Sequence, residues 1–260
     1  MEELINEAQK HSSLYHVAIG NSKDGNELAI PEGSGTLVTF SSGPVPIYGV
    51  LTAAHVLKKI RYQQTNRIGL SKAISYFDQL GCFTNFKYVQ LDEKNNSDFP
   101  DLGFICLGCG ESPKHELFDK SAFYDLGSNM QLPTEDDQVF STFIKGTSSK
   151  SRPDGLLNTF TAIGGGEKQK RDPSTGCDYW TIPNLLKESI EGASGAGFWR
   201  YKSINNRLHK SLEGVVISQS NDFSECYATG EDYLCSTFFE KLLVVAEYSI
   251  KEKFHTHYLS

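Results

Sequence analysis

The sequence predicts a mainly β protein with a helix at each end. Three observations predict this class: short runs of β-branched and aromatic residues recur along the chain, clusters of Gly, Pro, Ser and Asn separate them, and helical periodicity is confined to the two ends. Closely spaced short strands with frequent turns are typical of a β-barrel or a β-sandwich, and they disfavour a regular alternation of strands and helices.

The chain begins with a short segment of helical periodicity and continues with the predicted strands. Residues 2–11 place Leu4, Ile5 and Ala8 among Glu, Asn and Lys, which suits a short amphipathic helix. The strands that follow combine β-branched and aromatic residues and are bounded by turn formers. They are predicted at 15–19, 35–40, 47–52, 104–107, 138–144 and 212–217.

The later part of the chain contains a polar loop region and then a second helix. Residues 145–174 are rich in Ser, Gly, Lys and Asp, and we expect surface loops there around one strand, 156–163. A long segment of helical periodicity appears only over 236–251. Its apolar face consists of Phe239, Leu242, Leu243 and Ala246. This pattern predicts a C-terminal helix.

Composition and charge narrow the classes of partner. The 260 residues carry 25 Lys and Arg against 32 Asp and Glu, which gives a net charge of -7. Proteins that bind nucleic acid through its phosphates usually have the opposite balance, so no direct nucleic-acid partner is expected. No apolar run approaches the roughly 20 residues that span a bilayer, and the acidic N-terminus is unlike a secretory signal. We therefore expect a cytoplasmic protein without a membrane partner.

The cysteines and glycines indicate neither a metal nor a cofactor. Six cysteines are scattered through a chain large enough to fold without disulfides, so most are expected to be reduced thiols. Cys106 and Cys109 have no second Cys or His pair at zinc-finger spacing, which disfavours a metal or redox role for them. Residues 164–166, three glycines, are not followed by the Lys-Ser/Thr of a phosphate-binding loop. No metal and no cofactor are predicted.

Three short segments carry side chains suited to acyl transfer. His55 follows a predicted strand and a turn of small residues, Asp101 stands at the start of another strand, and Ser194 lies in a glycine-rich bend. A serine hydroxyl is a poor nucleophile unless an adjacent base, such as an imidazole, takes its proton. An acid that accepts a hydrogen bond from the far imidazole nitrogen fixes the tautomer of the ring. Each segment alone is common, but the three together point to a catalytic triad.

The three segments resemble the motifs of the trypsin-like (chymotrypsin-fold) serine peptidases, in an intracellular, bacterial-type branch. Thr52–His55 is similar to the family's Thr-Ala-Ala-His signature, and Asp101–Ile105 to its Asp-Ile-Ala-Leu-Leu segment. Gly192–Gly195 resembles Gly-Asp-Ser-Gly, and Gly33–Val38 resembles the Gly-Ser-Gly-Phe-Val strand that precedes the histidine. The resemblance extends over about residues 13–250.

The resemblance implies a chymotrypsin-like fold with two antiparallel six-stranded β-barrels and an active site in the cleft between them. The first barrel is expected near residues 13–120 and the second near 121–235. Residues 1–12 would form an N-terminal helix, and residues 236–260 a C-terminal helix and tail. The implied activity is that of a serine endopeptidase, which hydrolyses protein or peptide substrates through an acyl-enzyme intermediate.

The same resemblance assigns roles to individual residues. Ser194 is the nucleophile, His55 the general base, and Asp101 the residue that orients the imidazole. The backbone N–H groups of Gly192 and Ser194 match the family's two oxyanion-hole positions, and a glycine at 192 gives the backbone room to turn its N–H inward. Asp98 competes with Asp101 for the orienting role, but the predicted strand begins directly after Asp101, which is therefore favoured.

Four further residues are candidates for substrate binding. Glu188 stands where the family's primary pocket residue lies, which would suit Lys or Arg before the cleaved bond. A solvated loop glutamate is the competing interpretation of Glu188. Ile217, Ser218 and Gln219 replace the segment that usually lines this pocket and pairs with the substrate backbone by β-strand addition.

Three departures from the secreted members of the family bear on control. Val56 and Ile190 occupy positions where those members often have cysteines, in agreement with a reducing compartment. Ala193 replaces the acid that pairs with a freed N-terminus in zymogen-derived members, so activation by cleavage is not expected. Control would then come from a regulatory protein partner or a loop rearrangement. Analogy with intracellular bacterial relatives suggests a role in stress responses or antiviral defence.

Two other classes of protein stay open at this point. In an α/β-hydrolase-type esterase, Ser194 would be followed in chain order by Asp222 or Asp232 and then by His255. Ala196 breaks the Gly-x-Ser-x-Gly pattern of that class, and the chain lacks the expected alternation of strands and helices. The second alternative is a catalytically silent protease fold that serves as a binding module.

Overall fold

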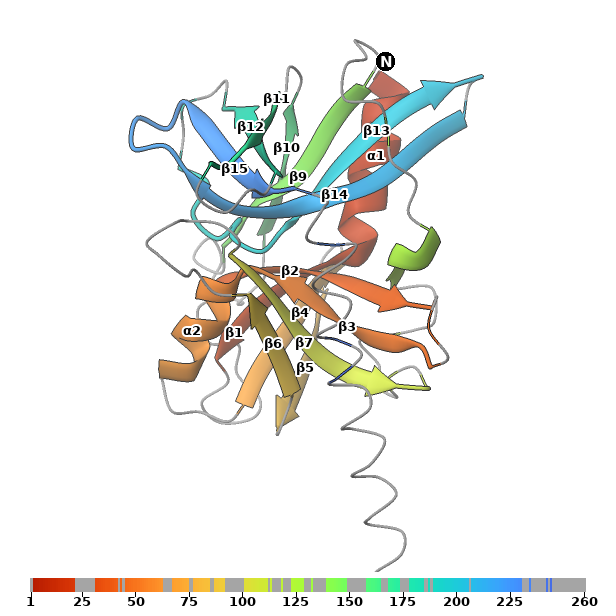
Figure 1. The fold of residues 1–260 in the computed structure, drawn as a ribbon, viewed down its shortest axis with the longest axis vertical. Coiled ribbons are helices and arrows are strands. Elements are labelled where there is room, and N and C mark those ends of the chain that lie inside the picture. Colours follow the sequence, from red (N-terminus) through yellow and green to blue (C-terminus); the bar gives the residue numbers. More distant parts are fainter. Residues whose placement is uncertain are drawn as a thin grey trace, which may run out of the picture.

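Two antiparallel β-sheets, with one helix packed against both, make up the computed structural model of the chain (Figure 1). The structure describes residues 2–21, 31–41, 43, 45–62, 67–74, 77–84, 87–91, 101–111, 113, 118, 123–128, 132, 139–148, 158–164, 168–173, 178–184, 187, 189–205, 207–230, 234, 242 and 244.

The first sheet gathers the strands of the N-terminal half. Its hydrogen-bonded order is β5-β4-β1-β2-β3-β7-β6, with every neighbouring pair antiparallel, and β8 pairs parallel with β2 off this path. The strands are β1 (His16–Asn21), β2 (Pro31–Phe40), β3 (Ile47–Thr52), β4 (Arg67–Ile74), β5 (Phe77–Thr84), β6 (Lys87–Leu91), β7 (Leu102–Cys109) and β8 (Tyr124–Asp125). Helix α2 (Ala54–Tyr62) follows β3, and a single 3-10 turn, η2 (Leu126–Ser128), follows β8.

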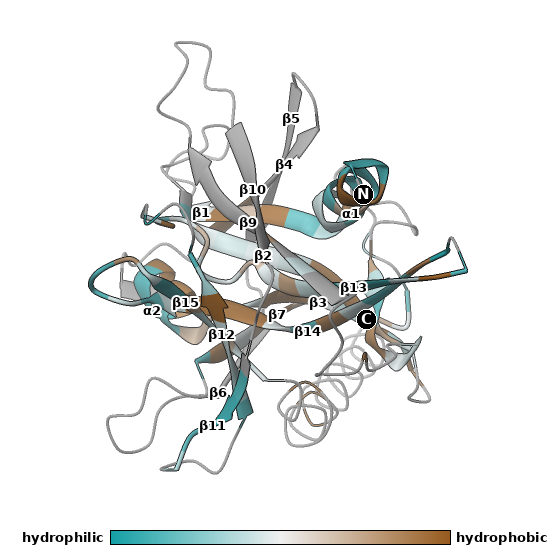
Figure 2. Cartoon of the chain, turned by 90° about the horizontal axis from the view of Figure 1, so that it is seen from above, coloured by the Kyte–Doolittle hydropathy of each residue, from teal (hydrophilic) through white to brown (hydrophobic). Residues whose placement is uncertain are grey.

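The second sheet gathers the later strands in the order β10-β9-β13-β14-β15-β12-β11, again with antiparallel neighbours throughout. Its strands are β9 (Val139–Ser148), β10 (Asn158–Gly164), β11 (Lys168–Arg171), β12 (Asp178–Pro183), β13 (Gly197–Ile204), β14 (Arg207–Gln219) and β15 (Glu225–Thr229). Figure 2 shows β11 hydrophilic along its length, whereas β14 carries a hydrophobic segment near the middle of the molecule.

These two curled antiparallel sheets confirm the mainly β class and its chymotrypsin-like arrangement. Each hydrogen-bonded path contains seven strands, where six per barrel were expected. In the first sheet, β4, β5 and β6 come from residues 67–91, in which Ser, Lys, Gln and Gly interrupt the β-forming residues. The predicted boundary at residues 120 and 121 stays a prediction, since β8 lies beyond it and pairs with the first sheet.

Helix α1 (Glu2–Tyr15) is longer than the sequence predicted and ends where a strand was expected to have begun. Tyr15 belongs to the helix because its ring packs against Tyr124, at a centroid distance of 5.5 Å, and against Trp199, at 5.6 Å. The helix contacts β2 of the first sheet and β9 and β13 of the second. Aromatic packing between distant parts of the chain therefore decides where this helix ends.

His11 anchors α1 to the second sheet through a buried polar contact. The Tyr201 hydroxyl donates to the Ala8 carbonyl at 3.1 Å and lies 3.0 Å from His11 Nδ1. Because the hydroxyl hydrogen is already used, Nδ1–H of the imidazole is the donor to the Tyr201 oxygen. Burial, with a smaller contribution from Lys210, lowers the pKa of His11 to about 3. The imidazole is therefore neutral at ordinary pH.

The C-terminal helix and tail predicted over 236–260 fall almost entirely outside the described residues. Leu242 and Val244 are described there, and both are helical; Leu242 is buried and Val244 is exposed. Among the described parts of the chain, no helix has the length and apolar character needed to cross a membrane.

The depressed pKa of His11 predicts an acid-sensitive attachment of α1. His11 binds a proton near pH 6.5 in the unfolded chain but only near pH 3 in the folded one. The contribution of neutral, buried His11 to stability is therefore complete above pH 6.5 and is lost as the pH falls towards 3. As the pH falls through this range, the free energy of unfolding of the wild type should decrease by up to about 1.4 kcal/mol per pH unit more than that of His11→Leu. Urea denaturation between pH 6 and 4 measures both slopes, and equal slopes would contradict the assignment.

Candidate active site

His55 is placed by a short strand-to-helix connection. Strand β3 ends at Thr52 and helix α2 begins at Ala54, so His55 lies in the first turn of α2. Ala53 and Ala54 are fully buried at this connection, and their small side chains let the turn pack closely beneath the histidine. The His55 side chain itself is about one third exposed.

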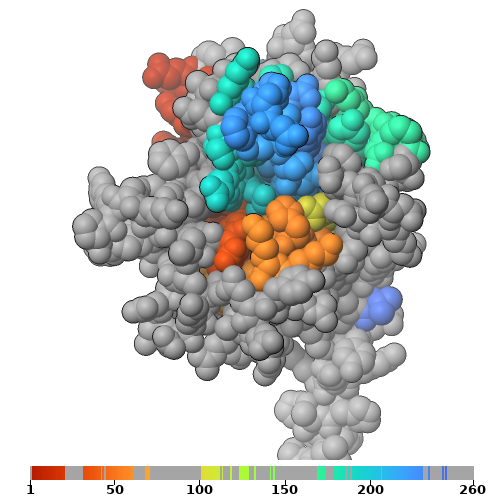
Figure 3. Space-filling model, turned by 90° about the vertical axis from the view of Figure 1, so that its left-hand side faces the viewer, coloured from red at the N-terminus to blue at the C-terminus, as the bar shows by residue number. Residues whose placement is uncertain are grey.

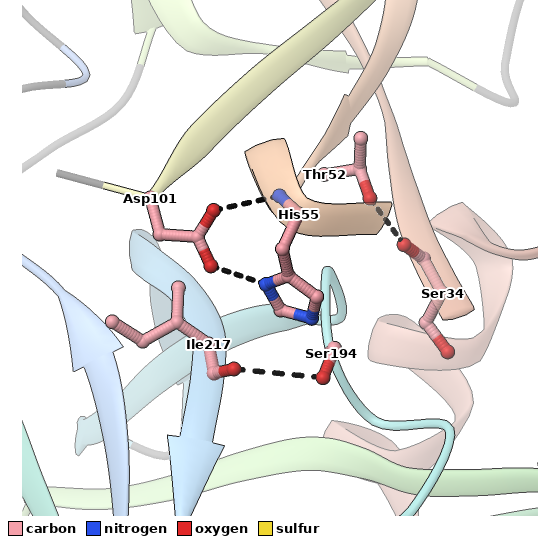
Figure 4. Close-up of polar contacts among 6 residues, drawn as sticks. All are labelled: Ser34, Thr52, His55, Asp101, Ser194 and Ile217. Carbon is pink, nitrogen blue, oxygen red and sulfur yellow. Dashed lines mark hydrogen bonds and ion pairs between the residues drawn. The ribbon is translucent and has the colours of Figure 1, made fainter. Parts of the chain in front are cut away.

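Asp101 holds His55 at two points. Its Oδ1 accepts the backbone N–H of His55 at 2.8 Å, and its Oδ2 contacts Nδ1 of the imidazole (Figure 4). The Asp101 carbonyl also accepts the Ala54 N–H at 3.3 Å. These contacts form because β3 and β7 are paired, with Thr52 opposite Gly103, so that the end of one strand lies beside the start of the other. The imidazole is thus oriented by a nearly buried carboxylate.

Ser194 lies in a tight bend between two glycines with positive φ. Gly192 has φ 89° and Gly195 has φ 92°, values that residues with a Cβ adopt only with strain. Ala193 N–H donates to the Ile190 carbonyl at 2.9 Å, and Gly195 N–H donates to the Val216 carbonyl at 2.7 Å. The bend is therefore fixed from within and by strand β14.

The first sheet holds this bend from its other side. Ser34 in β2 donates its N–H to the Ser194 carbonyl at 2.7 Å and its hydroxyl to the Gly192 carbonyl at 2.6 Å. Thr52 Oγ1 donates to the Ser34 carbonyl at 2.7 Å, and both Ser34 and Thr52 are fully buried (Figure 4). A Cβ at Gly195 would lie only 2.0 Å from the Ser34 carbonyl oxygen. The nucleophile-bearing bend thus packs directly on the strands that lead to His55.

Two backbone N–H groups in this bend have no hydrogen-bond acceptor among the residues that the structure describes. They are the N–H groups of Gly192 and Ser194, whereas those of Ala193, Gly195 and Ala196 each donate to a carbonyl. The two groups are the ones predicted for the oxyanion hole. Backbone donors kept unpaired in this way are available to a developing negative charge.

The Ser194 hydroxyl lies beside His55 but is directed elsewhere. Oγ donates to the Ile217 carbonyl at 3.5 Å, a long hydrogen bond, and within the described part of the chain it makes none to His55. In Figure 4 the imidazole nitrogen not used by Asp101 is on the side of Ser194. On the face seen in Figure 3, α2 (orange), which carries His55, lies next to the β14–β15 hairpin of the second sheet (blue).

The remaining predicted site residues are only partly described. Ile217 is buried, and Ser218 and Gln219 are half-buried near the end of β14, where they pair with β15. The Gln219 Oε1 accepts the Ile190 N–H at 2.8 Å, which ties β14 to the bend. Glu188 lies outside the described residues.

Three of the competing candidates, Asp98, Asp232 and His255, lie outside the described residues. Asp222 lies in the exposed turn between β14 and β15, where hydrogen bonds from Ser220 and Ser224 lower its pKa to about 2. The antiparallel sheets contradict the α/β-hydrolase alternative, which needs a largely parallel sheet with crossover helices.

Ser34 is a site residue that the sequence did not single out. Its sequence signal is the pattern Gly33-Ser34-Gly35, which by itself predicts a strand and assigns no role to the serine. Glycine at 33 is required because a Cβ there would lie 2.9 Å from the Ser194 carbonyl oxygen and 2.6 Å from the Val56 side chain.

Among the described residues, no three His, Cys, Asp or Glu side chains are grouped so that they could hold a metal ion.

Comparisons with known proteins give likeness of fold alone. No family model and no curated protein sequence matches the chain. Among solved structures, the apo MamO protease domain of Magnetospirillum magneticum is similar, with 12% identity, a TM-score of 0.48 and coverage of 86% of this chain and 96% of that one. A structure from work on the coupled folding and binding of the Sesbania mosaic virus VPg protein has 16% identity, a TM-score of 0.46 and coverage of 86% and 90%. At these values, neither likeness bears on catalysis in this chain.

The close packing of Gly195 predicts a large effect of a single methyl group. In Gly195→Ala, a residue with a Cβ would have to adopt a positive φ, and the Cβ would clash with the Ser34 carbonyl and Thr52 Oγ1. The substitution should therefore destabilise the fold by more than about 3 kcal/mol. Gly110→Ala is the matched control: its φ is 81°, but the nearest atom to its Cβ, in Val45, is 3.7 Å away, so only the backbone cost of about 1–2 kcal/mol remains. Urea denaturation compares the two, and similar losses would refute the packing argument.

Proposed function

We propose that the protein is a serine endopeptidase that hydrolyses protein or peptide substrates through Ser194, His55 and Asp101. The observation that carries this proposal is the coincidence of an Asp-oriented imidazole with two N–H groups, beside the same serine, that have no acceptor among the described residues. General base, nucleophile and oxyanion donors are the three parts that acyl transfer requires. Among the described residues, His55 and Asp101 lie at the ends of strands of the first sheet, and Ser194 lies in the bend before β13 of the second. These groups come together at one place.

The first chemical step would form the acyl-enzyme. The Ser194 hydroxyl turns from the Ile217 carbonyl towards His55, and its oxygen attacks the carbonyl carbon of the substrate while Nε2 takes the proton. The carbonyl oxygen becomes an oxyanion that accepts the N–H groups of Gly192 and Ser194. When the tetrahedral intermediate collapses, the C–N bond breaks and the imidazolium returns the proton to the leaving amine.

The second step would reverse these roles with water. His55 takes a proton from a water molecule, whose oxygen attacks the acyl carbon, and the ester bond to Ser194 breaks with return of the proton to Oγ. Asp101 orients and stabilises the imidazolium in both steps. No cofactor takes part in this sequence.

A catalytically silent protease fold is the second candidate, and one specific observation favours it. The Ser194 hydroxyl is bonded to the Ile217 carbonyl rather than to His55. Under the peptidase proposal this is a resting arrangement, which a regulatory protein partner in the cytoplasm would shift towards the active one. Under the silent alternative, the hydroxyl keeps this orientation permanently.

Labelling by a fluorophosphonate probe separates the two candidates. The probe reacts only with an activated serine, so the wild type should be labelled at Ser194 and Ser194→Ala should not. His55→Ala should slow labelling by at least about 10²-fold, because the general base is lost. Asp222→Asn, in the exposed turn, is the control and should label as the wild type does. Absence of labelling both alone and in a lysate of the source cells would favour the silent module.

Glu188 gives a separate prediction about specificity. If its carboxylate binds a basic side chain before the cleaved bond, Glu188→Gln should lower kcat/KM for an arginyl substrate by about 10²-fold, because the ionic partner is lost. The kcat/KM for the matching alanyl substrate should change little. Unaltered cleavage of the arginyl substrate would leave the peptidase proposal intact but would remove Glu188 from the pocket.

A further inference from the structure

Two cysteines lie side by side near the end of strand β7. The Sγ atoms of Cys106 and Cys109 are 3.7 Å apart, and both residues are half-buried. They belong to the strand that starts next to Asp101, but at its opposite end. The mechanism proposed above uses neither thiol.

A β-bulge explains why these two side chains meet. Side chains alternate between the two faces of a regular strand, so residues three apart point in opposite directions. Here Tyr48 pairs with Gly108 and the next residue, Gly49, pairs with Cys106, which leaves Leu107 as an extra residue without its own partner in β3. One extra residue resets the alternation, so Cys106 and Cys109 lie on the same side.

The turn that follows fixes the second cysteine. Gly110 has φ 81°, and its N–H donates to the Pro46 carbonyl at 2.8 Å, so the chain leaves the sheet directly after Cys109. Bulge and turn together hold the two sulfur atoms at a separation that the sequence spacing alone would not produce.

Cys226 shows what a structural cysteine looks like in this chain. It is 1% exposed and packs in an apolar cluster with Trp180 and Phe198. Cys106 and Cys109 differ from it in being only half-buried and in facing another sulfur. Within the described residues, no third ligand completes a metal site around them. The separation of 3.7 Å between the two sulfur atoms suits the pair to a covalent bond between its own members.

We propose that Cys106 and Cys109 form a redox site that closes reversibly to an intramolecular disulfide. A disulfide has an S–S distance of about 2.05 Å, so closure needs an approach of roughly 1.7 Å, which rotation of the two half-buried side chains near the strand end can supply. This inference does not rest on the peptidase proposal, because it involves neither Ser194 nor His55. It reverses the expectation from spacing alone, which disfavoured a redox role.

Hydrogen peroxide is the oxidant in this step. One thiolate attacks a peroxide oxygen, the O–O bond breaks, and a sulfenic acid and hydroxide form. The second thiolate attacks the sulfenic sulfur, the S–O bond breaks, and hydroxide leaves as the S–S bond forms. The two thiol protons convert both hydroxides into water. In total, two thiols give up two electrons and one peroxide yields two waters.

Thiol trapping on the full chain tests the proposal. The protein is reduced with dithiothreitol, desalted, treated with a small molar excess of hydrogen peroxide, alkylated and analysed by peptide mass spectrometry. The segment with Cys106 and Cys109 should lose two hydrogen atoms and both alkylation sites, and dithiothreitol should restore them. We expect at least about tenfold more of this disulfide in the wild type than any bridge that includes Cys226.

Variants provide the controls, although the wild-type result alone decides the proposal. Cys106→Ser and Cys109→Ser should each retain a peroxide-sensitive thiol that forms no intramolecular bridge. Cys226→Ser and Ser194→Ala should both close the disulfide normally, and the latter result separates this inference from the peptidase proposal. Alkylation of both thiols after peroxide treatment, or their direct progress to sulfinic acids, would overturn it.

Discussion

The contact between Ser34 and the bend that carries Ser194 is the constraint on which the candidate site depends. Ser34 donates to the Ser194 and Gly192 carbonyls, and Gly195 packs against the Ser34 carbonyl. This contact joins the bend of one sheet to the strand pair of the other, which leads to His55. Because it combines a backbone hydrogen bond of 2.7 Å with a hydrogen bond of 2.6 Å from the Ser34 hydroxyl, it fixes the position of the serine through two directional contacts.

The hydrogen bonds within and around the bend decide which of its N–H groups stay available. Carbonyls at 192 and 194 are held by Ser34, while the N–H groups of Ala193 and Gly195 are used inside the bend and by β14. The positive φ of Gly192 and Gly195 lets the bend direct its carbonyls and its N–H groups to these different partners. As a result, the N–H groups of Gly192 and Ser194 have no acceptor among the described residues. Preorganised donors of this kind cost no reorganisation when charge develops beside them.

Buried polar contacts tie other segments to the second sheet. The contact between His11 and Tyr201 attaches α1. Arg200 and Glu213 form an ion pair in which each side chain is 2% exposed. The pair also binds the backbone of Leu132, whose N–H donates to Glu213 Oε1 and whose carbonyl accepts from Arg200 Nη1. Burial raises the pKa of Glu213 and the nearby Arg200 opposes that shift. Breaking one partner of such a pair costs more than replacing both, so these contacts specify an arrangement rather than add much stability.

The sequence by itself determined the mainly β class and the residue types of the site, because strand periodicity, turn formers and the motifs around His55, Asp101 and Ser194 are local patterns. It did not determine where α1 ends, the role of Ser34, or the meeting of Cys106 with Cys109. Those depend on aromatic packing, on a hydrogen bond between sheets and on a bulge in strand pairing. Each involves residues far apart in the chain, so only the tertiary structure decided them.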